Sequence, residues 1–317
     1  MTSTAMPVIP LKTYRFYFNT AAPVRLPEYP GSAWRGAFGH ALKRTVCVVR
    51  NTPCQACLLR RACAYSYVFE TPPPANTEKM RKYNTIPHPF VFRFAANGLE
   101  YAYSLDLTLF GHGLRFFPYI IHAMQTAGQD GIGGSRHAFL LNRIDEIDFQ
   151  GRPVTVYEDG HLQQLEPAQT PAAPDMPAKI RLTFHSPVRI KHDSKNLAAG
   201  DFSFGALFSA LLRRISMLSY FYTDTPLDTD FAALTAAARM ARFSEQNLRW
   251  YDWTRYSSRQ QTEMNLGGLI GNVSLDMQGM DDFWPYLWLG QWTHVGKATS
   301  MGLGAYSIGA ASLSTSR

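Results

Sequence analysis

Two kinds of hydrophobic periodicity divide the chain into strands and helices. Apolar residues at every second position predict strands at 11–19, 101–110, 136–147, 179–191, 248–256 and 266–276. Apolar residues at helical spacing predict helices at 32–46, 116–127, 204–222 and 228–241. Each half of the chain mixes the two kinds of element without strict alternation, which is typical of an α+β fold. Two tandem ferredoxin-like (RNA-recognition-type) domains fit this order best.

A helix, a glycine-rich loop and a strand follow one another twice. The first loop is at 128–135 and the second at 293–306, where Lys297 adds a positive charge to the glycines. Glycine can adopt positive φ and allows a phosphate to come close to backbone amides. The repeated unit therefore predicts a duplicated fold with a polyanion-binding loop in each half.

A proline-rich segment separates the two halves. Four prolines occur at 166–177 without a periodic apolar pattern, which predicts an interdomain linker at 166–178. The expected domains are then 1–165, with a cysteine-rich insertion at 47–63, and 179–317. Two domains also agree with a length of 317 residues.

Composition favours a globular protein that works away from membranes. Hydrophobic residues make up 46% of the chain, enough for two cores, and no apolar run is long enough to span a bilayer. The N-terminus resembles no signal peptide, so a cytoplasmic location is expected. The net charge of +7 alone points only weakly to nucleic acid. Arginines interspersed with aromatic residues at 242–259 strengthen the indication of nucleic-acid binding, since that mixture suits phosphate contacts and base stacking.

All four cysteines fall in one short segment: Cys47, Cys54, Cys57 and Cys63, with the spacing C-x6-C-x2-C-x5-C. Such spacing favours a structural zinc site with four thiolate ligands. An iron–sulfur cluster is the less favoured alternative, and free thiols are the third. Four protein ligands would leave zinc no open position, so no catalysis is assigned to this segment. A catalytic metal is not expected elsewhere either, because the carboxylates near 145–148 and 281–282 lack a second acidic cluster.

The helix predicted at 32–46 has two distinct faces. Trp34, Phe38 and Leu42 belong to its apolar stripe, whereas Gly36, Gly39, His40 and Lys43 gather on the opposite side. Glycine inside a helix costs about 1 kcal/mol, so these glycines need a reason. Either bare backbone lets a bulky ligand lie beside His40 and Lys43, or the glycines permit tight packing against a neighbouring element.

Several motifs together resemble a known family. They are Trp34-Arg-Gly-Ala-Phe-Gly-His-Ala-Leu42, Gly131-Ile-Gly-Gly-Ser-Arg-His-Ala-Phe139, Phe184-His-Ser-Pro-Val-Arg-Ile190, Gly267-Gly-Leu-Ile-Gly-Asn-Val273, His294-Val-Gly-Lys297 and Met301-Gly-Leu-Gly-Ala-Tyr306. In this order the chain resembles the CRISPR precursor-RNA-processing endoribonucleases of the RAMP superfamily, the sixth-numbered family of CRISPR-associated proteins.

The resemblance implies a metal-independent enzyme that binds CRISPR repeat RNA and cuts the precursor once in each repeat. The ribose 2′-OH attacks the phosphate, leaving a 2′,3′-cyclic phosphate and a 5′-OH. A histidine on the first helix is expected to be catalytic, here His40, with Tyr29 and Lys43 as partners. Both lie closer to His40 than the family pattern places them. His294 with Lys297 is a reserve pair.

Further cationic and hydroxyl residues are candidates for RNA contact: Arg35, Arg136, Arg213, Arg214, Arg255, Ser257, Arg259, His294, Lys297, Thr299 and Ser300. Two other functions remain open. One is a non-catalytic RNA-binding RAMP subunit of a CRISPR effector complex, and the other is a zinc-stabilised RNA-processing enzyme outside CRISPR. Expected partners are crRNA and other CRISPR effector subunits, with no membrane contact.

Overall fold

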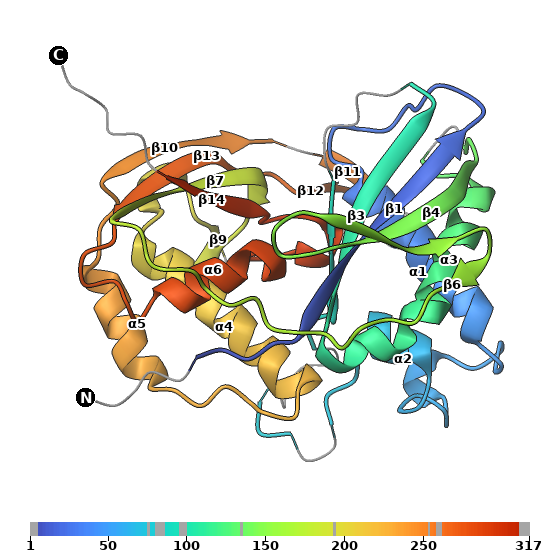
Figure 1. Cartoon of the computed structure of the whole chain (residues 1–317), viewed down its shortest axis with the longest axis horizontal. Coiled ribbons are helices and arrows are strands. Elements are labelled where there is room, and N and C mark those ends of the chain that lie inside the picture. The colour runs from blue at the N-terminus through green and yellow to red at the C-terminus, as the bar shows by residue number, and fades with distance from the viewer. Residues whose placement is uncertain are drawn as a thin grey trace. The chain divides into compact units, whose positions relative to one another are not determined.

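A computed structural model describes residues 6–74, 77–79, 86–94, 100–133, 136–192, 195–252, 254–257 and 262–310. The chain divides into two compact units (Figure 1). The N-terminal unit comprises Ile9–Thr170 with Met217–Thr225, and the C-terminal unit comprises Pro171–Ser216 with the chain from Pro226 onward and the residues before Ile9. The division at Thr170 and Pro171 lies within the segment predicted as a linker. In the part of the chain that the structure describes, no helix is both long and apolar enough to cross a bilayer.

The N-terminal unit is built on a βαββαβ order. Its core elements are β1 (Leu11–Thr20), α1 (Gly31–Val46), β2 (Phe90–Arg93), β3 (Ala102–Phe110), α3 (Phe117–Asp130) and β4 (Phe139–Ile147). The additional elements are α2 (Ala64–Phe69), β5 (Pro153–Glu158) and β6 (His161–Leu162). The antiparallel sheet has the order β2-β3-β1-β4-β5-β6, so the first and third strands of the motif are central.

The C-terminal unit repeats this plan, and the last turns of its helix α4 (Phe204–Tyr222), from Met217, belong to the N-terminal unit. Its elements are β7 (Lys179–Val188), β8 (Lys191–His192), β9 (Lys195–Asn196), α4 (Phe204–Tyr222), α5 (Phe231–Met240), β10 (Glu245–Tyr251), β11 (Thr254–Ser257), β12 (Thr262–Asn265), β13 (Gly268–Asp276), α6 (Trp284–Thr293) and β14 (Tyr306–Ala310). The main sheet has the order β10-β13-β7-β14, which matches β2-β3-β1-β4 position by position. The short 3-10 helices are η1 (Cys54–Ala56), η2 (Gly111–Phe116), η3 (Ala199–Asp201) and η4 (Thr299–Met301).

The predicted fold class is confirmed: the protein is α+β, with two tandem ferredoxin-like domains. The helix, glycine loop and strand unit occurs twice, as α3 to β4 and as α6 to β14. In each unit the glycine loop joins the second core helix to the last strand of the motif, and that strand pairs with the first one. Short elements such as α2 and β2 were not predicted, since four to six residues are too few to establish a period.

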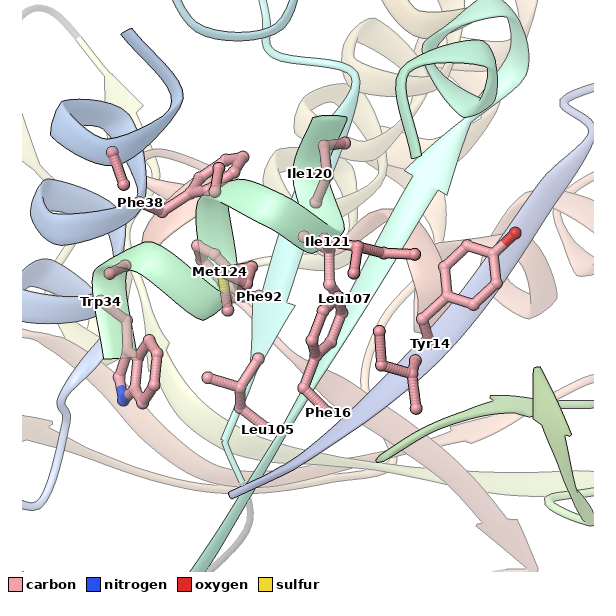
Figure 2. Close-up of a cluster of buried hydrophobic side chains, with 14 of the residues drawn as sticks. Tyr14, Phe16, Trp34, Phe38, Phe92, Leu105, Leu107, Ile120, Ile121 and Met124 are labelled. Carbon is pink, nitrogen blue, oxygen red and sulfur yellow. The ribbon is translucent and has the colours of Figure 1, made fainter. Parts of the chain in front are cut away.

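The core of the N-terminal unit fixes the orientation of α1. Trp34, Phe38 and Leu42 are completely buried and belong to one cluster with side chains of α3 and the sheet. Figure 2 shows Trp34 and Phe38 of α1 in the same cluster as Ile120 and Met124 of α3. Burying a large apolar side chain contributes about 1.5–3 kcal/mol. This stripe therefore holds the apolar face of α1 inward and leaves the opposite face exposed.

Candidate functional site

The exposed face of α1 carries a glycine, a histidine and a lysine in line. Gly36, His40 and Lys43 are all exposed, and their spacing of four and three residues places them on one face of the helix. A Cβ built on Gly36 would meet nothing within 4 Å. A ligand can therefore reach the helix backbone at Gly36 while it contacts the imidazole of His40.

The second glycine of this helix has a different role. Gly39 is buried, and a Cβ built on it would lie 2.4 Å from Cζ of Phe69. The packing explanation therefore holds for Gly39, whereas the ligand explanation stays a prediction for Gly36. Gly39 permits tight packing of α1 against α2, and Gly36 leaves open backbone beside His40.

One flank of α1 is lined by stacked rings and two cations. Phe69 stacks on Tyr65 and on His88, with ring centroids 5.7 Å and 5.6 Å away. The Arg35 guanidinium lies 4.4 Å from the centre of the Phe69 ring, and Lys43 Nζ lies 5.6 Å from that of Tyr65. The packing of Tyr65 and Phe69 agrees with a core role for these aromatic residues.

The position of Arg35 is fixed by a histidine that sequence reasoning missed. Arg35 Nη2 lies 2.9 Å from His88 Nε2. A guanidinium can only donate hydrogen bonds, so Nε2 of His88 accepts and carries no proton. His88 follows Arg35 by 53 residues. No local sequence signal connects the two, and only the tertiary structure brings them together.

Tyr29 lies before the start of α1, whereas His40 lies in its second half. It precedes the first residue of α1, Gly31, by two positions. Nine residues of helix, about 14 Å along the axis, separate Gly31 from His40. The helix geometry therefore favours Lys43, one turn from His40, over Tyr29 as its nearest functional neighbour. The catalytic assignment of Tyr29 stays a prediction.

The C-terminal glycine loop is held against the end of β7 by its own backbone. The amide of Lys297 donates to the carbonyl of Arg189 at 2.9 Å, and the amide of Gly304 donates to that of Pro187 at 3.1 Å. The amide of Ala305 donates to Ser186 Oγ at 3.0 Å. These three amides bind protein acceptors, so the expectation that the loop amides face a polyanion is wrong for them.

Side chains of this loop point in opposite directions. His294 is 1% exposed, and its Nδ1 lies 3.2 Å from the carbonyl oxygen of Leu303. Thr299 and Ser300 are also buried, whereas Lys297 is exposed. His294 and Lys297 therefore do not form a pair on one surface. Among these four predicted RNA-binding residues, the geometry leaves Lys297 accessible.

Replacing Gly304 with Ala is expected to destabilise this loop by about 2 kcal/mol or more. Gly304 has φ of 72°, and a Cβ there would lie 1.9 Å from the Val295 carbonyl oxygen. Backbone strain costs about 1–3 kcal/mol, and the clash adds to it. Gly309→Ala is the matched control, because nothing lies within 4 Å of its Cβ position. Denaturant unfolding measures both, and equal midpoints for the two variants would contradict this account.

The remaining predicted RNA-binding residues differ in accessibility. Arg136 and Arg213 are exposed. Arg214 is buried, and its Nε donates to the carbonyl of Thr293 at 2.8 Å, so it caps the end of α6. The backbone of Arg255 and Ser257 belongs to β11. Their side chains and Arg259 lie outside the described residues.

The cysteine segment shows no preformed metal site. In the described part of the chain, no group of three or more His, Cys, Asp or Glu residues could hold a metal ion. Cys47 Sγ lies 3.4 Å from the Val49 carbonyl oxygen. Burial raises the pKa of the Cys54 thiol, which disfavours the thiolate that zinc needs, although the positive charge of Lys43 opposes this shift. The structure does not support the predicted zinc site, which stays a prediction that metal analysis of the purified protein would test.

Two family models match the chain. Residues 9–170 match the AF_1859_N family, described as an N-terminal domain. Residues 182–306 match the model of the CRISPR-associated endoribonuclease Cas6. Each match lies in one unit, except that the second also includes Met217–Thr225 of the N-terminal unit.

Individual proteins show the same similarity. A Cas6 product complex superposes with a TM-score of 0.59 and 16% identity, covering 94% of this chain and 99% of that one. Cas6 from Thermus thermophilus superposes with a TM-score of 0.55 and 15% identity, covering 95% of this chain and 98% of that one. An uncharacterized protein of Archaeoglobus fulgidus is 26% identical over 135 residues, which is 42% of this chain and 45% of that relative. At these identities the structural matches establish a shared fold.

Proposed function

We propose a function from the premise that this chain belongs to the Cas6 family of CRISPR-associated endoribonucleases through residues 182–306, and to the AF_1859_N family through residues 9–170. The proposed function is that the protein binds CRISPR repeat RNA and cleaves the precursor transcript within each repeat. The single observation that carries the cleavage proposal is the exposed row of Gly36, His40 and Lys43 on α1. The row combines a proton-transfer group, a positive charge and open backbone.

The proposed reaction is a transesterification at phosphorus. The 2′-oxygen of the nucleotide upstream of the cut forms a bond to phosphorus, and the bond from phosphorus to the 5′-oxygen breaks. The proton of the 2′-OH leaves, and one proton is delivered to the 5′-oxygen. The products are a 2′,3′-cyclic phosphate and a 5′-OH, and no catalytic metal takes part.

Each residue of the site supplies one part of this chemistry. An imidazole titrates near neutral pH and can act as base or acid, so His40 takes one of the two proton transfers. Lys43 or Arg35 supplies positive charge to the phosphorane, whose negative charge grows in the transition state. Arg35 is supported by its contacts with Phe69 and His88, which restrict its side chain before RNA binds.

An assay with end-labelled repeat RNA tests the proposal. Cleavage is expected with and without EDTA, with products that carry a cyclic phosphate and a 5′-OH. A substrate with 2′-deoxyribose upstream of the cut should bind and remain intact. A wild-type protein that binds the repeat but never cuts it would instead support the alternative, a non-catalytic RNA-binding subunit. This chain also covers 48% of one chain of a solved Cas6–RT–Cas1–Cas2 complex, which supports a search for other CRISPR subunits as partners.

Replacing Gly36 with Ala should separate stability from activity. The new Cβ meets no atom within 4 Å and lies inside a helix, so the variant should gain about 0.5–1 kcal/mol of stability. If RNA lies against this backbone, the same methyl group should weaken cleavage about tenfold. Thermal unfolding and single-turnover kinetics measure the two effects. A variant that is more stable and fully active would show that RNA does not approach Gly36.

A further inference from the structure

The region around the cysteine segment has an unusual charge distribution. No Asp or Glu occurs between Glu28 and Glu70. Six basic residues occur in the same stretch: Arg35, Lys43, Arg44, Arg50, Arg60 and Arg61. With a chain total of 31 Lys and Arg against 24 Asp and Glu, this stretch concentrates positive charge in one part of the sequence.

The cysteine segment, Cys47–Cys63, exposes most of its side chains. It joins α1 to α2 as a series of turns around η1, closed by bonds such as Arg60 N to Cys57 O and Cys63 N to Leu59 O. Figure 1 shows it in light blue at the margin of the N-terminal unit. Cys54 and Cys63 pack against the hydrophobic core. Leu58 is 101% exposed, so the turn at 57–62 projects into solvent.

Three of these six basic residues have no carboxylate partner among the described residues. Arg44 forms an ion pair with Asp130 across to the end of α3. Lys43, Arg50 and Arg61 are exposed, and within the described ranges none of the three forms an ion pair with a carboxylate. An exposed cationic surface attracts polyanions, and phosphate contacts supply much of the affinity of RNA-binding proteins.

We propose that Arg50 and Arg61 of the cysteine segment, together with Lys43, form a second contact surface for RNA. They bind backbone phosphates of nucleotides next to the one held at His40, without selecting bases. The segment begins directly after α1. Its first residue, Cys47, follows His40 by seven residues, which is about 10 Å along the helix axis. This inference rests on the proposed function, because it requires that RNA bound at His40 continues past the C-terminal end of α1.

The test uses the double variant Arg50→Gln/Arg61→Gln and a repeat RNA made uncleavable by 2′-deoxyribose at the cut. Its affinity is expected to fall about tenfold. The slope of log K against log salt should become shallower by about 1.4, because each phosphate that the protein no longer neutralises reduces the slope by about 0.7. Single-turnover cleavage at saturating RNA should stay at the wild-type rate, because neither residue belongs to the proposed catalytic row.

Arg44→Gln/Arg152→Gln is the matched control. It removes the same formal charge from two arginines that already pair with Asp130 and Asp148. The control should change the salt slope by less than half as much. Equal losses of affinity in both variants would mean a general charge effect. Wild-type affinity in the Arg50→Gln/Arg61→Gln variant would mean that RNA does not contact this surface. Either result overturns the proposal.

Binding and cleavage are measured separately, so the two proposals fail in different ways. A wild type that binds RNA without cutting it refutes the proposed cleavage activity, and RNA binding to the second surface can still be measured.

A rival occupant of the exposed Leu58 turn is a protein subunit. That rival predicts that Leu58→Ser abolishes association with the subunit while the Arg50→Gln/Arg61→Gln variant keeps wild-type RNA affinity.

Discussion

Replacement of His40 with Ala is expected to lower the single-turnover rate of repeat cleavage by about 10²–10⁴-fold. The imidazole is the only group of the exposed row on α1 that suits proton transfer near neutral pH, and alanine cannot transfer a proton. The dissociation constant for repeat RNA should change by less than about threefold, since phosphate contacts by other cations carry most of the affinity. Quenched-flow or manual-mixing kinetics at saturating enzyme measure the first quantity, and filter binding measures the second.

A partly exposed histidine elsewhere in the same unit provides the control. His112 lies 3.3 Å from a carboxylate oxygen of Asp224 and belongs to no element of the proposed site. His112→Ala should cleave at the wild-type rate. His40 is exposed, so its replacement should leave the unfolding midpoint unchanged. A rate loss of less than about tenfold in His40→Ala would move proton transfer to another residue.

Replacement of Trp34 with Ala is expected to cost about 3–5 kcal/mol of stability. Trp34 is completely buried, and its ring centroid lies 5.0 Å from that of Phe18 and 5.5 Å from that of Phe139. Removing the indole leaves a cavity between α1 and the sheet. Because α1 carries His40, cleavage should fall together with the folded fraction. Denaturant unfolding followed by far-UV circular dichroism measures the loss of stability.

Trp250→Ala serves as the comparison for this cavity. Trp250 is 38% exposed on the edge strand β10 of the other unit, where truncation leaves no closed cavity. Its replacement should cost about 1 kcal/mol or less. If Trp34→Ala were no less stable than Trp250→Ala, the assignment of Trp34 to the core that orients α1 would be wrong.

The amino-acid sequence contains enough information for the elements and their class. Residues 204–222 were predicted as a helix and form one with the same bounds, and β1 and α1 lie within one residue of their predicted limits. Long elements with one buried face repeat their apolar residues many times, so the period is clear without knowledge of neighbours. The exposed face of α1 followed from the same logic, because burying Trp34 and Phe38 turns His40 and Lys43 outward.

Accessibility within the glycine loops and the basic groups did not follow from sequence. Arg213 and Arg214 are adjacent in the chain, yet one is exposed and the other caps α6. His294 and Lys297 lie in the same loop, yet the imidazole is buried and the ammonium is exposed. Irregular backbone has no period from which the direction of a side chain could be inferred.

The sequence by itself thus determined the duplicated ferredoxin-like plan and the helix that presents His40, because regular secondary structure follows from local periodicity. Only the tertiary structure decided which glycine of α1 packs and which stays open, and that His88 holds Arg35. Gly39 meets Phe69 and Arg35 meets His88 through chain segments 30 or more residues apart, so these contacts form only when the fold has brought the segments together.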